Sequence, residues 1–303
     1  MATPTRDSLQ LFQETNQEFE YELDCDACGC AVGSATYGME NLLSSNFIGV
    51  RYLHQYYKAK EDVFSNQLNQ KQHFNTVQVW AKIPVSNQID LIASLPYHSH
   101  QKSGDNSVSI NGIGDANVMG TYKIIQPSEN ATDNVKHFFN AAIGIKIPLA
   151  KFNNVYADTP NPSFQLGTGS WDTQFGLNYQ ITIKDISVQM VTDYNLKGEN
   201  KNKYKFGDQW NQLIQIQYPI LKNNTQLIGK LGFQNEFYQA NKQFNEFIPK
   251  TKGNLQLAKI GLEGSTSKFN YGIEYLLPIR SDLNSGEVKF KNRLGLFINY
   301  KIF

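Results

Sequence analysis

Residues 171–194 read WDTQFGLNYQITIKDISVQMVTDY, and their pattern is the clearest indication of the fold class. Its apolar residues recur at every second position on both sides of a short break at Lys184 and Asp185. A period of two is the signature of β-strands, whose side chains point alternately to opposite faces. The stretch therefore predicts two antiparallel strands, each with one apolar and one polar face, joined by a tight turn.

The same alternation recurs along the chain from about residue 46 to the C-terminus, and no segment of comparable length has a helical period. At 255–262 the phase of the apolar residues slips, which predicts a β-bulge. About twelve strands are expected, with apolar members in the runs 48–56, 77–83, 89–97, 116–124, 141–147, 171–181, 186–194, 214–220, 227–233, 255–262, 269–277 and 294–302.

The breaks between these runs alternate in length. Long breaks lie near 59–73, 100–112, 149–170, 196–207, 239–253 and 280–291, and short ones at 86–88, 184–185, 222–224 and 264–267. A soluble sandwich has no reason for this alternation, whereas an outer-membrane barrel has short periplasmic turns and long extracellular loops. The prediction is an all-β fold: a transmembrane antiparallel up-and-down β-barrel of about 12 strands over residues 46–303.

Aromatic placement and strand length distinguish this barrel from a soluble all-β protein, which alternation alone leaves open. Trp171 and Trp210 begin strands on the long-loop side. Near the short-turn ends lie Tyr179, Tyr218, Tyr271 and Tyr300. Two interfacial girdles of this kind, on runs long enough for the roughly 9–11 residues of a crossing, favour a membrane barrel.

Composition excludes several other classes of protein. The 303 residues include 28 Lys and Arg against 27 Asp and Glu, so no basic excess indicates nucleic acid as a partner. No stretch approaches 18 apolar residues, which excludes a helical membrane span. Residues 1–24 have neither a basic nor an apolar signal region, so the chain is either cytosolic or a mature form restarted at Met1. A mean hydropathy of −0.45 is what a barrel with one polar face should have.

The polar faces carry charges of both signs. Such a lining can solvate small polar solutes without strong ion preference, or can pair across a narrow lumen and close it. Residues 1–45 form a separate N-terminal segment, expected beneath the barrel in the periplasm or inside it as a plug. The predicted pore-lining residues are Arg51, Lys82, Asp115, Lys123, Lys146, Asp172, Lys230, Glu236, Glu274 and Arg293.

Two motifs are candidates for metal binding. Cys25, Cys28 and Cys30 lie together in CDACGC, where thiolates could converge on copper or zinc. A local disulfide with a spare thiol is at least as well supported, and three inert thiols are a third interpretation. His98 and His100 share one strand face near a long-loop mouth, either as a chelating pair or as hydrated polar residues.

Catalysis is not predicted. Outer-membrane phospholipases need a serine nucleophile beside a histidine, and none of the five histidines is followed two residues later by serine. A nucleophile elbow, a P-loop and a dinucleotide fingerprint are also missing from the sequence.

The C-terminus LFINYKIF, residues 296–303, resembles the terminal signature of bacterial outer-membrane proteins, although Phe303 is out of phase with the apolar face. FQLGTGSWD at 164–172, YKFGD at 204–208 and the CDACGC motif resemble a family of Bacteroidota outer-membrane barrels labelled as transporters. The resemblance implies a location in the bacterial outer membrane, with its lipid as one partner. The predicted function is diffusion of small solutes, with soft metals as candidates. The alternative is a non-conducting accessory barrel that binds partner proteins through its loops or N-terminal segment.

Overall fold

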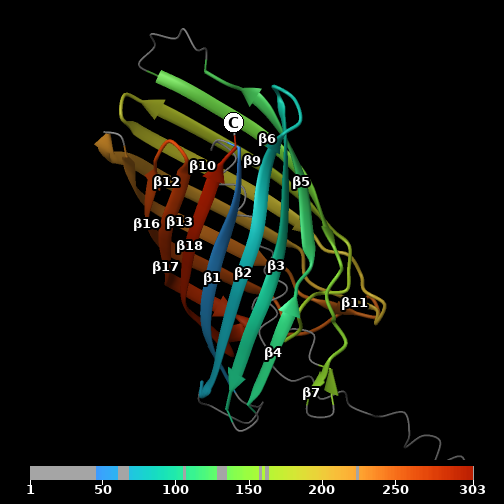
Figure 1. The fold of residues 1–303 in the computed structure, drawn as a ribbon. Coiled ribbons are helices and arrows are strands. Elements are labelled where there is room, and N and C mark those ends of the chain that lie inside the picture. Colours follow the sequence, from blue (N-terminus) through green and yellow to red (C-terminus); the bar gives the residue numbers. More distant parts are fainter. Residues whose placement is uncertain are drawn as a thin grey trace, which may run out of the picture.

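The computed structural model describes residues 46–60, 68–104, 107–127, 135–156, 159–160, 164–222 and 225–302. Over these residues the chain forms a closed antiparallel barrel in which the first strand pairs with the last (Figure 1). The wall has twelve strand positions, one of them divided into β4 and β5. In order they are β1 (Phe47–Ala59), β2 (Gln70–Pro84), β3 (Ile89–Ser103), β4 (Val108–Ile113) with β5 (Ala116–Ile125), β6 (Val135–Ile147), β9 (Asp172–Ile183), β10 (Ile186–Leu196), β12 (Gln209–Lys222), β13 (Gln226–Tyr238), β16 (Gly253–Ser265), β17 (Phe269–Leu283) and β18 (Val288–Lys301).

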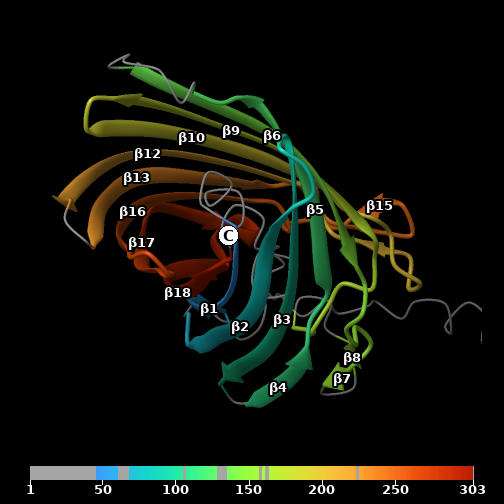
Figure 2. The same cartoon turned by 45° about the horizontal axis from the view of Figure 1, so that its top comes forward.

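Several short strands and a 3-10 turn lie at the long-loop end of the barrel. Two short sheets lie beside the wall there (Figure 2), and a 3-10 turn joins β17 to β18. Among the described residues there is no helix long and apolar enough to cross a membrane. The small elements are β7 (Val155–Tyr156) with β8 (Thr159–Pro160), β11 (Tyr204–Lys205) with β14 (Lys242–Gln243) and β15 (Glu246–Phe247), and η2 (Asn284–Gly286).

The predicted alternation of inner and outer residues is confirmed along most of the wall. On β9, for example, Asp172, Gln174 and Asn178 are buried on the inner face, while Phe175 and Leu177 are exposed on the outer face. An exterior of exposed Ile, Leu, Val, Phe and Tyr side chains is incompatible with water and suits the hydrocarbon of a bilayer. Trp171 and Trp210 lie on this exterior at the long-loop end, and Tyr218, Tyr271 and Tyr300 at the short-turn end, as predicted.

The fourth wall strand is broken at Gly114 and Asp115. β4 and β5 both pair with β3, but only β5 pairs with β6 on its other side. β6 ends at Ile147 and β9 begins at Asp172, and in between the described residues form no wall strand. This irregular stretch includes Phe164, Gln165 and Leu166, all of which are buried.

Two of the predicted long loops are wrong. Strands β3 and β4 extend into 100–112, and β17 and β18 extend into 280–291, so only short connections remain. The ends at 280–291 alternate poorly in sequence because their buried residues are mostly apolar, whereas the buried residues at 100–112 include His100 and Lys102. Leu283, Val288 and Phe290, for instance, are buried on the inner face.

A register shift does lie within the predicted 255–262, between Gln256 and Leu257, but the extra residue is not on β16 itself. β16 pairs regularly with β13, and the register shift occurs against β17, where Ile279 is the extra residue. The apparent slip in sequence arises because Leu255 and Leu257 face the interior and are fully buried, whereas Ile260 and Leu262 face outward.

At the long-loop end the barrel interior holds an apolar core. Its members come from the inner faces of six successive wall strands, β13 to β2, from β4, and from the irregular stretch after β6. Aromatic contacts join Phe74 to Tyr57 at 5.8 Å and to Phe164 at 5.9 Å between ring centroids. We call this the outer core. It consists of Tyr57, Ala59, Phe74, Ile110, Ala150, Phe164, Leu166, Tyr238, Leu255, Leu257, Leu276, Leu283, Val288 and Phe290.

Candidate functional site

The interior faces of β5, β9, β10 and β12 carry a ladder of amides. Gln189 is its hub: its carbonyl oxygen accepts from Gln215 and Gln217, both at 2.7 Å, and its amino group donates to Asn178 at 3.1 Å. Gln174 on β9 donates to Asn117 on β5 at 3.1 Å, across the intervening strand β6. Because an amide carries both donors and an acceptor, such a ladder satisfies itself without net charge.

The ladder continues toward the long loops around Asp193. This carboxylate accepts from Asn195 at 2.8 Å and from Asn211 at 2.7 Å, and Gln209 in turn donates to Asn211 at 2.8 Å. All of these side chains are buried. We call the whole set, from Asn117 to Gln217, the amide wall.

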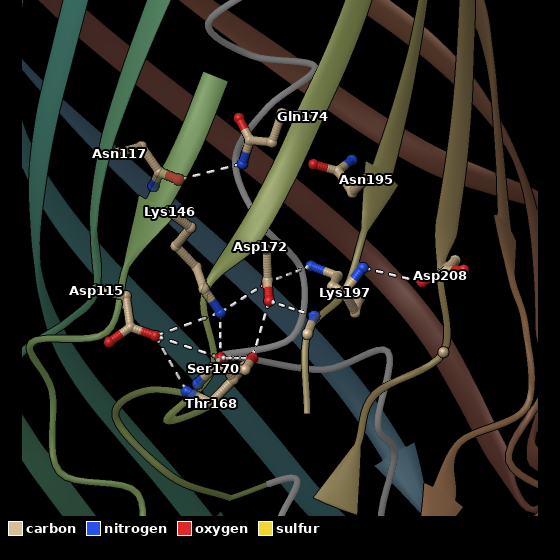
Figure 3. Close-up of polar contacts among 12 residues, drawn as sticks. Asp115, Asn117, Lys146, Thr168, Ser170, Asp172, Gln174, Asn195, Lys197 and Asp208 are labelled. Atoms are coloured by element: carbon tan, nitrogen blue, oxygen red, sulfur yellow. Dashed lines mark hydrogen bonds and ion pairs between the residues drawn. The ribbon is translucent and has the colours of Figure 1, made fainter. Parts of the chain in front are cut away.

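A network of charged side chains lies at the break between β4 and β5, beside the end of β6 and the start of β9 (Figure 3). Lys146, at the end of β6, lies 2.7 Å from Asp172 and 3.4 Å from Asp115, and it also donates to the hydroxyl of Thr168. Lys197 lies 3.5 Å from Asp172. Two lysines therefore face two carboxylates, all four buried, and their formal charges cancel.

This network also fixes the irregular stretch after β6. Asp115 accepts the backbone N–H groups of Ala150 at 3.0 Å and Thr168 at 3.1 Å. Ser170 donates to Asp172 at 2.8 Å. The motif at 164–172 is thus a segment folded into the barrel mouth, where its polar residues bind the carboxylates and Phe164 and Leu166 enter the outer core.

The second motif, at 204–208, has a similar structural role. Asp208 accepts the backbone N–H of Lys197 at 2.9 Å and the hydroxyl of Tyr194 at 3.2 Å. Tyr204 and Phe206 pack with Ile248 in a separate small cluster. The motif therefore orders the loops after β10 and β13.

A buried ion pair spans the opposite part of the interior. The guanidinium of Arg293 on β18 lies 2.6 and 3.3 Å from the two oxygens of Glu236 on β13, although β16 and β17 separate these strands. Arg293 also donates to Gln55 at 3.1 Å. This two-pronged pair packs with the outer core, since Arg293 lies over the ring of Phe290 at 5.4 Å.

The structure places all ten predicted lining residues on the interior face. Besides the pairs above, Lys82 and Lys123 both contact Asp90, at 3.3 and 2.9 Å. Lys230 lies 2.5 Å from Glu263, and Glu274 lies 2.8 Å from Lys259. Arg51 donates to Gln78 and stacks over Trp80. Their role in a pore stays a prediction, but the interior charges form short-range pairs.

The prediction missed several partners in these pairs. Lys197 was overlooked because it lies just beyond β10, in a predicted loop. Lys259 and Glu263 were not predicted because a bulge was expected in this strand, which left it unclear which face they are on. Both lie an even number of residues from Leu257 and therefore face inward with it. Counting every second residue from Leu255 would have found both.

The predicted metal residues divide into two groups. Cys25, Cys28 and Cys30 lie outside the described residues, as does the whole predicted segment 1–45. His98 and His100 are both buried on the inner face of β3, with ring centroids 4.8 Å apart. In the part of the chain that the structure describes, no group of three or more His, Cys, Asp or Glu side chains could hold a metal ion.

The fold and the exterior define the class of protein. A closed antiparallel barrel with an apolar exterior and a polar interior is an outer-membrane β-barrel. No family model and no curated protein matches the chain.

Solved structures with similar folds agree with this class. The COG4313 outer membrane channel from Pseudomonas putida F1 aligns with a TM-score of 0.66 at 15% identity, over 86% of this chain and 96% of that chain. The beta domain of the Bordetella autotransporter BrkA aligns with a TM-score of 0.51 at 10% identity, over 86% of this chain and 100% of that chain. At such low identity the likeness concerns the fold.

Proposed function

We propose that this protein is a non-enzymatic outer-membrane channel through which small solutes diffuse. The observation that carries the proposal is the amide wall, which lines one side of the interior over four strand positions. Side chains that donate and accept hydrogen bonds can exchange partners with water and with a polar solute. The similar Pseudomonas putida protein is itself named an outer membrane channel.

The pairing of interior charges bears on selectivity. Lys146 and Lys197 balance Asp115 and Asp172, and Arg293 balances Glu236. Paired charges present little net field to a passing ion. We therefore expect weak discrimination between anions and cations, and passage of neutral polar solutes.

Conductance and liposome swelling test the proposal. Full-length protein reconstituted in planar bilayers should give channels of low ion selectivity, and liposomes carrying it should swell in neutral sugars up to a size limit. A matched pair of variants locates the path. Gln189→Leu, in the amide wall, should alter both measurements, and Gln101→Leu, exposed on the outer face of the same barrel, should alter neither.

A specific observation favours the alternative function. The outer core and the Arg293–Glu236 pair fill the interior at the long-loop end of the barrel with buried side chains. A barrel closed in this way could act as an accessory protein that binds a partner through its loops. Absence of both conductance and swelling in correctly folded protein would favour this function over the channel.

The proposal includes soft metal ions among the candidate solutes. Both ring nitrogens of His100 are buried and have no hydrogen-bond partner among the described residues, and His98 uses only Nδ1, toward Thr76 at 2.9 Å. Two adjacent imidazoles can therefore offer nitrogen ligands to copper or zinc. His98→Gln/His100→Gln should lower zinc retained by purified full-length protein. Equal retention would rule out the histidine pair and leave the cysteines as the ligands to test.

A further inference from the structure

Three lysines line up on the outside of the barrel at the long-loop end. Lys58 on β1 lies directly opposite Lys71 on β2 and opposite Lys289 on β18 in the strand register. All three alternate with buried residues, so they point away from the interior, and Lys71 and Lys289 are exposed. We call this row the lysine patch.

Like charges directly opposite one another on neighbouring strands destabilise a sheet. Most interior lysines of the barrel avoid this cost because each contacts a carboxylate, as Lys82, Lys146 and Lys259 do. Within the described residues, no lysine of the patch forms an ion pair. The nearby Asp282 on β17 lies 3.8 Å from Arg280 instead. In a chain with a net charge of only +1, the described residues therefore gather three positive charges here without a partner carboxylate among them.

The patch lies above the membrane-facing surface. On β1 and β2 the exposed apolar exterior includes Val50, Val77 and Val79. A polar layer follows, in which Tyr52 and His54 both contact the amide oxygen of Asn75 at 2.8 Å. The lysine patch follows this layer along the strands, farther from the membrane-facing surface. From Tyr52 to Lys58 a strand rises about 20 Å along its axis, or roughly 15 Å in height at the usual barrel tilt.

That height decides which anion fits the patch. A lysine side chain can reach back toward the membrane by several ångströms, but the acyl chains and their linkages still lie below it. The anion must therefore belong to a headgroup that extends well above the hydrocarbon. A sugar headgroup bearing phosphates has this reach and this charge, and it is held beside the barrel by its own acyl chains.

We propose that the lysine patch binds the phosphorylated sugar headgroup of a glycolipid in the outer leaflet. The three ammonium groups neutralise its phosphates, and the polar layer of Tyr52, His54 and Asn75 lies beneath the sugar at the membrane boundary. Binding relieves the repulsion within the row. The site is on the outside of the barrel, so it does not depend on whether the interior conducts solutes.

Binding of a defined glycolipid tests the proposal. Full-length protein in detergent is titrated with an acylated disaccharide lipid carrying two phosphates, and separately with the same lipid after phosphate removal. We expect the phosphorylated lipid to bind at least about tenfold more tightly, with the difference shrinking at high salt. Lys58→Gln/Lys71→Gln/Lys289→Gln should lose about tenfold or more in affinity for the phosphorylated lipid.

A matched variant controls for loss of charge alone. Lys136→Gln/Lys184→Gln/Lys268→Gln removes three exposed lysines from the short-turn end and should bind the lipid like the original protein. Heat-modifiable gel migration confirms that each variant is folded. Equal binding by the patch variant, or equal binding of the dephosphorylated lipid, would overturn the proposal. Pyrophosphate that binds the patch as tightly as the lipid would identify a soluble anion as the occupant and overturn it as well.

Discussion

The two sides of the barrel interior are built from different chemistry. On β5, β9, β10 and β12 the inner faces carry amides that bond to one another around Gln189 and Asp193, beside a small buried apolar cluster that includes Met119, Val191 and Leu213. At the long-loop ends of β13, β16, β17, β18 and β1 the inner faces carry most of the outer core and the Arg293–Glu236 pair. Amides can exchange their partners for water or solute, whereas a packed apolar core cannot. Under the proposed channel function, solutes pass along the amide side, and the packed side holds the barrel mouth together.

The largest expected effect comes from breaking the ion pair of the packed side. Arg293→Ala leaves the carboxylate of Glu236 buried without its counter-charge, which should cost about 3–5 kcal/mol of unfolding free energy. Denaturant unfolding in detergent, followed by gel migration, measures it. The double variant Arg293→Leu/Glu236→Leu should recover most of the loss, because neither charge remains. A single variant as stable as the original would show that water reaches this pair.

A truncation within one strand tests the packing of the outer core. Leu257→Ala opens a cavity among fully buried side chains and should cost about 2–5 kcal/mol. Leu262→Ala, on the outer face of the same strand, is the matched control, with 44% of its side chain exposed. Lipid or detergent can fill the space it leaves, so its cost should be smaller. Equal losses for the two variants would contradict the assignment of an inner and an outer face on β16.

Alternation was enough to predict the wall, because each strand has one face toward lipid and one toward polar side chains. It failed where both faces are apolar. In β16, Leu255 and Leu262 look alike in the sequence, yet the first lies in the outer core and the second faces outward. The same ambiguity turned the ends of β17 and β18 into a predicted loop.

The sequence predicted which residues belong to the candidate site, but it did not predict which of them contact one another. The alternation of inward and outward residues along each strand was enough to place Glu236 and Arg293 on the interior. Their pairing across two intervening strands depends on the curvature of the barrel. Likewise, the motif at 164–172 gave no sign that Thr168 would donate to Asp115, since that contact requires the break between β4 and β5. Long-range pairs of this kind follow from closure of the sheet, which no local pattern encodes.

An intermediate effect is expected on the amide side. Gln189→Leu removes the acceptor of both Gln215 and Gln217 and should cost about 1–3 kcal/mol. Because the same change removes hydrogen-bonding groups from the wall, swelling in neutral sugars should slow as well. A variant that loses stability but keeps the original swelling rate would separate the amide wall from the solute path.

The smallest effect is expected for an ion pair outside both regions. Lys222 and Asp185 contact each other at the short turns, where about half of each side chain is exposed. Solvent screens such a pair, so a double-mutant cycle with Lys222→Ala and Asp185→Ala should give a coupling of about 0–1 kcal/mol that disappears in high salt. The Arg293–Glu236 pair, buried in the same molecule, should keep its coupling at the same salt concentration. Equal weakening of both pairs by salt would mean that water and ions reach the interior beside the outer core as freely as the surface. The two sides of the barrel would then differ in side-chain type but not in their access to solvent.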